Sequence, residues 1–332
     1  MSQSKKFSVL FLLFLVAVVL NITLGSVILP KKILLDLLDF NLNQDSPYHQ
    51  IIFDFRMPKM FAAILSGIGL GLSGLFMQSI FRNPIVGPYV LGLSSGAGLG
   101  VALLILGGSL IGINLYSGVS VVLAAALGST LTLLLLISFY YKLKNTVGLL
   151  IVGLMIGIFS GAVINILSYF TQAQKLQKYV FWSMGNLGNL SWNNILLLTI
   201  IIIISVGIIL FKIKPVNALL LGENYARTMG VNIRKTNLTV IIITGILTGS
   251  ITAFVGPIAF IGLAVPHLAR LIFKTQLLQY LVPAGMLIGS VLMLFCDMLA
   301  QLPGSILTLP INSLTALLGA PLLIYMIIKN KT

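Results

Sequence analysis

The chain has 332 residues, of which 58% are hydrophobic and only 8% are charged. A soluble domain carries roughly 25% charged residues, so this composition excludes a soluble globular protein and indicates one embedded in a membrane. The net charge of +14 does not predict a nucleic-acid partner, because the cations are scattered over short segments between apolar runs and form no basic helix.

Apolar runs follow one another along the whole chain. A helix that crosses a bilayer needs about 20 residues. Cutting the sequence at its polar clusters predicts ten such spans, at residues 7–29, 57–80, 89–106, 117–141, 147–170, 193–211, 237–255, 257–273, 278–298 and 310–328. No soluble domain separates them, so we expect residues 1–332 to form one all-α transmembrane domain. The first span is too long for a signal-peptide core and should be retained.

The basic residues predict the orientation in the membrane. If the N-terminus is inside, fourteen of the twenty Lys and Arg residues fall on the inner side, as expected for cytoplasmic loops. We therefore expect a multi-pass protein of a bacterial cytoplasmic membrane, surrounded by the lipid bilayer, with both termini in the cytoplasm.

The second span begins with the sequence RMPK and ends at the break Asn83-Pro84. Irregular backbone at this depth must be covered by protein or line a water-filled path. Pro58 is expected to be the first helical residue, which would place Arg56 and Lys59 at the positive end of a helix at a cost of ~0.3 to 1 kcal/mol each. An acidic partner protein would relieve this cost. The alternative is that both cations simply snorkel to the interface.

The fifth span combines small and polar residues. Gly153, Gly157 and Gly161 recur every four residues, and Ser160 and Asn165 lie beside them. Small residues at this spacing let helices approach closely, so simple bundle packing is one interpretation. The polar groups cost free energy unless they are paired or hydrated. We therefore predict that these five residues line a transport path.

The inner segment 212–236 is predicted to form two short helices, divided at Gly222 and stopped at Gly230 by a glycine C-cap. It offers a mixed apolar and polar surface that could fit a groove on a soluble protein and pass motion to the membrane. The alternative is an amphipathic segment in the headgroup layer. The candidate contact residues are Gly222, Glu223, Tyr225, Ala226, Arg227, Met229 and Gly230.

Motifs for chemistry are missing. The chain lacks the G-x-x-x-x-G-K-[ST] loop that cradles nucleotide phosphates, so any ATP hydrolysis must occur on a partner. Asp297 is the only acid inside a predicted span, which gives little support to an ion-coupled secondary transporter. His49, His267 and the single cysteine, Cys296, suggest neither a metal site nor a catalytic triad. We expect no enzyme activity, no metal site and no cofactor bound by this chain.

Several motifs occur in a fixed order after residue 54, and together they cover nearly all of the remaining chain. They are RMPK, GLGLSGLFMQSIFRNPIVGP, LGLSSGAG, FWSMGNLGNLSW, GENYARTMGV, FIGLAVPHLAR and LTALLGAPLLIYMI. With these motifs the chain resembles the FecCD family, the permeases of type II ABC importers for iron-siderophore complexes, haem and cobalamin. The resemblance implies about ten transmembrane helices per subunit and a second permease subunit, identical or different, around a central path.

The resemblance also implies roles for individual residues. GENYARTMGV resembles the coupling helices that dock on cytoplasmic ATPase subunits. Asn83, Ile85 and Thr146 fall where a similar cobalamin importer forms its cytoplasmic gate. Arg56 and Lys59 resemble basic anchors that receive carboxylates of an extracytoplasmic substrate-binding protein.

The sequence departs from the family pattern near its end. Asp297 is kept, but Gln301, Thr308 and Asn312 stand where the family has Arg, Glu and Gly. Loss of the cation and the acid puts full binding-protein docking in doubt and would suit a heterodimer with a sister permease that keeps them.

The expected function is that of a membrane subunit that imports a ferric siderophore or similar metal chelate. Haem or cobalamin uptake, and ion-coupled secondary transport, are the alternatives.

Overall fold

The structure is a computed structural model, and it describes residues 2–25, 27, 29–30, 46–108, 117–143, 146–301 and 308–329. For Thr146 and for several residues near the end of the last helix, it describes the backbone only.

The described residues form helices connected by short turns. In chain order the elements are α1 (Gln3–Thr23), α3 (Pro47–Gln50), η1 (Ile51–Arg56), α4 (Met57–Phe81), η2 (Pro88–Leu91), α5 (Leu93–Ala102), η3 (Leu103–Gly107), α7 (Gly118–Lys142), α8 (Thr146–Phe170), α9 (Ala173–Ser183), α10 (Trp192–Leu220), α11 (Glu223–Thr228), α12 (Ile233–Val255), α13 (Ile261–Phe273), α14 (Leu278–Ala300) and α15 (Ile311–Lys329).

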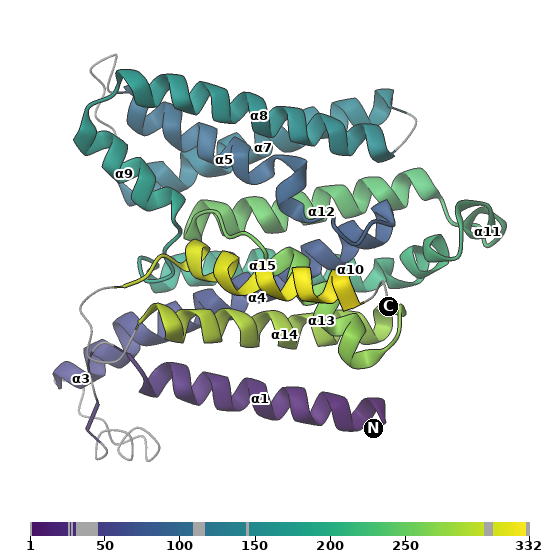
Figure 1. The fold of residues 1–332 in the computed structure, drawn as a ribbon, viewed down its shortest axis with the longest axis horizontal. Coiled ribbons are helices and arrows are strands. Elements are labelled where there is room, and N and C mark those ends of the chain that lie inside the picture. Colours follow the sequence, from purple (N-terminus) through teal and green to yellow (C-terminus); the bar gives the residue numbers. More distant parts are fainter. Residues whose placement is uncertain are drawn as a thin grey trace.

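The long helices run side by side as a bundle, with α1 at one edge and α8 at the opposite edge (Figure 1). Helix α4 occupies the centre and packs against α10, α12, α13 and α14. The short elements α3 and α9 lie at one end of the bundle, and α11 lies at the other (Figure 1). This arrangement confirms the predicted all-α membrane architecture.

Glycine contacts hold the centre together. Gly67 of α4 lies against Gly289 of α14 so closely that a Cβ atom on either residue would overlap the backbone of the other. Gly74 of α4 meets the backbone of Gly262 in α13 in the same way. In a bilayer, such contacts replace the hydrophobic driving force that packs soluble helices. Small residues therefore allow α4 to pack closely against α13 and α14.

Each of the ten predicted spans corresponds to a helical region. Within the part of the chain that the structure describes, seven helices are long and apolar enough to cross a membrane by themselves. The third span is broken, because Gly92 adopts φ 73° between η2 and α5. The eighth begins only at Ile261, because Gly256 adopts φ 87° and ends α12. The tenth span is α15.

Two further helical boundaries and one whole helix differ from the sequence prediction. The second span does not begin at Pro58, since α3 and η1 continue directly into α4 and Ser46 provides the helix cap. The sixth span does not end at residue 211, because α10 runs through Pro215 to Leu220. Helix α9 was not predicted; it is amphipathic, and none of its residues is buried.

Candidate functional site

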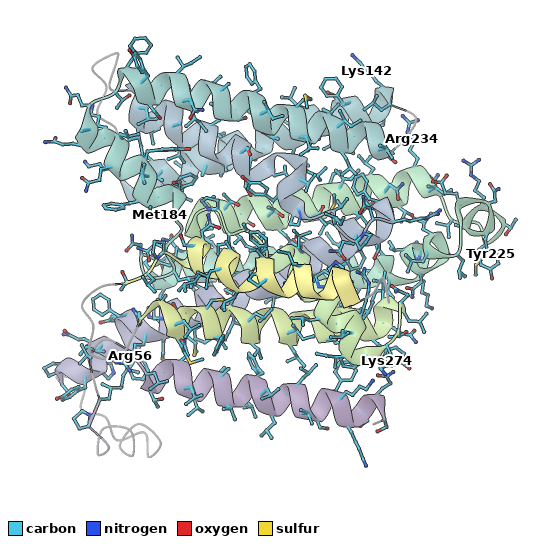
Figure 2. All side chains as sticks on the ribbon, viewed as in Figure 1. Arg56, Lys142, Met184, Tyr225, Arg234 and Lys274 are labelled. Atoms are coloured by element: carbon cyan, nitrogen blue, oxygen red, sulfur yellow. The ribbon has the colours of Figure 1, made fainter. Side chains whose placement is uncertain are left out.

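Functional candidates gather at the two ends of the bundle. Tyr225, Arg234, Lys142 and Lys274 lie at one end, and Arg56 and Met184 lie at the other (Figure 2). We call these the inner and the outer end. The inner end carries residues that the charge pattern assigned to one side of the membrane, so the structure groups them as predicted.

The break after α4 is a tight turn at the inner end. Arg82 adopts a left-handed conformation, φ 47°, and ends the helix. The side-chain oxygen of Asn83 accepts a hydrogen bond from the backbone N–H of Ile85 at 3.0 Å. Asn and Asp side chains commonly stabilise turns in this way. Ile85 is 64% exposed, so the turn presents an apolar side chain at the surface.

Two long-range hydrogen bonds fix this turn to neighbouring elements. Arg82 donates through Nη2 to the carbonyl oxygen of Leu219 at the end of α10, at 2.7 Å. The Nε2 atom of His267 in α13 lies 2.9 Å from the carbonyl oxygen of Pro84 and must donate, because a carbonyl only accepts. The predicted gate segment is therefore tied directly to the base of the predicted coupling segment.

Helix α11 (Glu223–Thr228) lies within the predicted coupling segment, residues 222–230. Gly222 has φ 127° and Gly230 has φ 76°, and such angles are strained for residues with a side chain. The N–H of Val231 donates to the carbonyl of Ala226 at 2.9 Å, which closes the C-terminus of the helix. Both predicted glycine boundaries are thus observed, although the first of the two predicted helices is the last part of α10.

One face of α11 is buried and the other is exposed. Ala226 is fully buried and packs in a small cluster with Ala218 and Leu219 of α10. Tyr225 is 49% exposed and Met229 is 60% exposed. Glu223 and Arg227 are also exposed, so the same surface carries polar as well as apolar side chains. The segment is consequently a rigid knob with an unpartnered apolar surface.

The third predicted gate residue, Thr146, is the first residue of α8. Its side chain lies outside the described residues, so its proximity to Asn83 and Ile85 stays a prediction.

The predicted path-lining residues of α8 differ in burial. Gly153 is buried against the backbone of Leu91, and Ser160 is only 1% exposed. These two residues therefore pack helices in this conformation. Gly157 and Gly161 are partly exposed, and Asn165 is exposed. The exposure of these three residues is compatible with a role in lining a path, which stays a prediction.

At the outer end, Arg56 is buried and closes α1. Its guanidinium donates hydrogen bonds to the carbonyl oxygens of Ile22, Thr23 and Val27. The last carbonyls of a helix lack partners within the helix and carry the negative end of its dipole. Arg56 is thus a cap for α1.

Lys59 forms an ion pair inside the bundle. Its Nζ atom lies 2.7 Å from Oδ1 of Asp297 in α14. The other carboxylate oxygen accepts a hydrogen bond from Nδ2 of Asn21 in α1 at 3.0 Å. Residues from α1, α4 and α14 therefore meet at one buried junction, which the sequence analysis did not predict.

These contacts correct the electrostatic argument for docking. Arg56 and Lys59 do not crowd a helix N-terminus, because the helix begins ahead of them at Pro47. Both cations have internal partners, and neither is a free snorkelling charge. Their contact with a binding protein stays a prediction, but repulsion at a helix N-terminus no longer supports it.

Of the three departures from the family pattern, Gln301 lies beside this junction. Gln301 lines a cavity of about 260 Å³ together with Arg56 and Lys59. Asn312 accepts a hydrogen bond from the N–H of Ala259 at 3.0 Å, and its own N–H donates to the carbonyl of Met184. Asn312 therefore joins α15 to the end of α9. Thr308 is exposed.

The sequence matches the model of the FecCD transport family over residues 13–329. The chain belongs to the FecCD transport family. It is 33% identical to a haemin transport permease of Yersinia pestis, over 86% of this chain and 85% of the relative. It is 34% identical to a vitamin B12 import permease of Salmonella arizonae, over 84% of this chain and 83% of the relative.

A solved structure shares the fold of this FecCD chain. It is an inward-facing conformation of a metal-chelate type ABC transporter, with a TM-score of 0.85 and 30% sequence identity, and the match covers 99% of this chain and 100% of the other. Both the resemblance to the family and the predicted all-α membrane fold are confirmed.

Proposed function

We propose that this chain is the membrane-spanning subunit of an ATP-binding-cassette importer for a ferric siderophore or a similar metal chelate, delivered by an extracytoplasmic substrate-binding protein. The observation that carries the proposal is family membership over residues 13–329. The metal-chelate class is supported by the transporter that matches this chain over nearly its whole length. Haem or cobalamin is the second candidate, favoured by the haemin and vitamin B12 relatives.

ATP is hydrolysed on separate cytoplasmic subunits that dock on residues 222–230. The geometry supports this step, because Ala226 anchors the knob while Tyr225 and Met229 remain exposed. A partner that covers two such side chains gains apolar burial, and the buried anchor passes its movement into α10. Arg82 then links that movement to the turn after α4 through its hydrogen bond to Leu219.

A second permease subunit completes the path. The exposed face of α8 carries large apolar side chains, including Ile158, Ile166 and Tyr169, with Asn165 among them. A polar amide exposed on a membrane helix needs a partner or water. A homodimer or heterodimer that places this face at the path would supply one, with Asn83, Ile85 and Thr146 at the inner constriction.

Uptake in cells tests the proposed substrate. A strain that lacks this gene should lose uptake of the ferric siderophore and regain it from a plasmid copy. Depletion of ATP should stop uptake, whereas an uncoupler that spares ATP should not. Uptake that fails with the uncoupler at normal ATP would indicate a secondary transporter instead. Competition by excess haemin or cobalamin would identify the second candidate.

A further inference from the structure

A polar cavity of about 520 Å³ opens at the inner end, beside the turn after α4. It lies between the end of α4, helix α13 with the loop that follows it, and the end of α10. Its described lining residues are Gln78, Ser79, Arg82, Asn83, Pro84, Leu220, His267, Arg270, Leu271, Lys274 and Gln276.

The charges around the cavity all have one sign. Arg82, Arg270 and Lys274 supply three cations, and none of the described lining residues is acidic. Lys274 occurs at the left-handed end of α13, with φ 50°, and its side chain is exposed. Cations gathered without counter-charge repel each other, so an anion in the cavity would lower the free energy of the folded protein.

Two of the residues that line the cavity carry buried donors without acceptors. Gln78 is only 3% exposed, and its side-chain oxygen is used by Nη1 of Arg270. The amide nitrogen of Gln78 and the Nε atom of Arg270 are both buried, and neither has a hydrogen-bond partner among the described residues. Buried donors without partners are costly, and native proteins usually satisfy them.

We propose that this cavity binds a phosphate group. Donors reach it from α4, from α13 and from the loop after α13, which suits a tetrahedral oxyanion better than a planar carboxylate that one guanidinium can satisfy. Two sources share this chemistry: free phosphate, and the headgroup of an anionic phospholipid. Basic pockets between membrane helices on the cytoplasmic side are suited to such headgroups.

The site adjoins the machinery proposed above without depending on it. Leu220 lines the cavity and lies two residues before the coupling segment, while Arg82 lines the cavity and donates a hydrogen bond to Leu219. A bound phosphate would therefore stiffen the connection between the turn after α4 and the end of α10. Binding itself is a property of the permease alone, so it can be tested without an ATPase or a transport substrate.

The single cysteine provides the measurement. Cys296 is buried, so a thiol-reactive dye reports unfolding of the purified permease as it is heated. A ligand that binds only the native state raises the unfolding temperature in proportion to its concentration relative to Kd. We would titrate sodium phosphate in phosphatidylcholine nanodiscs against sodium chloride of equal ionic strength, because screening alone also acts on clustered charges.

Phosphate should raise the unfolding temperature of the wild type beyond the chloride control. Lys274→Gln and Arg270→Gln should each weaken apparent phosphate affinity about tenfold, as expected for one lost charged hydrogen bond. Lys274→Arg keeps the positive charge and should retain the phosphate-induced shift. This result would show that the weaker shift of Lys274→Gln comes from loss of the charge and not from misfolding. Lys235→Gln, which removes an exposed cation elsewhere on the inner end, should behave like the wild type.

A second nanodisc separates the two sources. If phosphatidylglycerol fills the cavity, discs containing it should start at a higher unfolding temperature and gain little from added phosphate. If free phosphate is the ligand, the phosphate shift should persist in both discs. A wild type that responds to neither, or a response that Lys235→Gln weakens as much as Lys274→Gln, overturns the proposal.

Discussion

Removing Lys59 alone should destabilise the protein strongly, because its ion pair with Asp297 is buried. The side chains of Lys59 and Asp297 are only 13% and 5% exposed. Loss of one partner from a buried pair costs about 3 to 5 kcal/mol. Lys59→Met leaves the carboxylate with the hydrogen bond from Asn21. We therefore expect the free energy of unfolding to fall by about 3 kcal/mol, the lower limit of this range.

The pair should be dispensable as a unit. Replacing both residues by neutral ones of similar size, in Lys59→Met with Asp297→Asn, removes the desolvation cost of the charges together with their attraction and keeps an acceptor for Asn21. The double variant should therefore lie within about 1 kcal/mol of the wild type. The exposed control Lys235→Met should change stability by less than about 0.5 kcal/mol.

Reversible unfolding in SDS, followed by the fluorescence of Trp182 and Trp192, would give these free energies. The double-mutant cycle then isolates the coupling between the two side chains. A neutral Lys59→Met would refute the buried pair. If that variant kept full stability but lost binding-protein docking, Lys59 would be a docking anchor, as the sequence first suggested.

Three further predictions concern the inner end. Tyr225→Asp or Met229→Asp should abolish substrate-stimulated ATP hydrolysis by the assembled transporter, whereas Tyr225→Phe should preserve it; normal stimulation in the Asp variants would exclude this docking surface. Gly222→Ala forces a side chain into φ 127° at a cost on the order of 1 to 3 kcal/mol, so it should reduce the same stimulation without loss of membrane insertion, and full stimulation would argue against a rigid knob. Cysteines at positions 83, 85 and 146, in a background lacking Cys296, should react with a thiol reagent at rates that depend on bound nucleotide, and equal rates in every state would count against a gate.

The sequence predicted features that depend on local composition. Apolar length located each span, and Gly222 and Gly230 marked the ends of α11 because positive φ angles favour glycine. Helix α9 escaped detection because its residues are amphipathic and too few to cross a bilayer. The extension of α10 through Pro215 was missed because a proline normally disfavours a helix interior.

Long-range pairing was the part that the sequence could not supply. Lys59 and Asp297 were interpreted separately, one as a docking cation and one as an isolated acid, although each is the partner of the other. Arg56 was likewise interpreted as a contact for a binding protein, because nothing near it in the chain shows that it would cap the end of α1. The α8 prediction was limited in the same way, since the burial of Ser160 depends on where α5 and α7 lie.

The most direct test of the central claim is import by the reconstituted complex. The permease and its ATPase would be reconstituted in proteoliposomes together with the binding protein. One sample would have ATP on the side of the membrane that carries the ATPase, and a second sample would have no ATP. Labelled ferric siderophore should accumulate only with ATP and the binding protein, and Tyr225→Asp should abolish accumulation while Tyr225→Phe retains it. Accumulation that proceeds without ATP, or that follows an imposed ion gradient instead, would contradict the account.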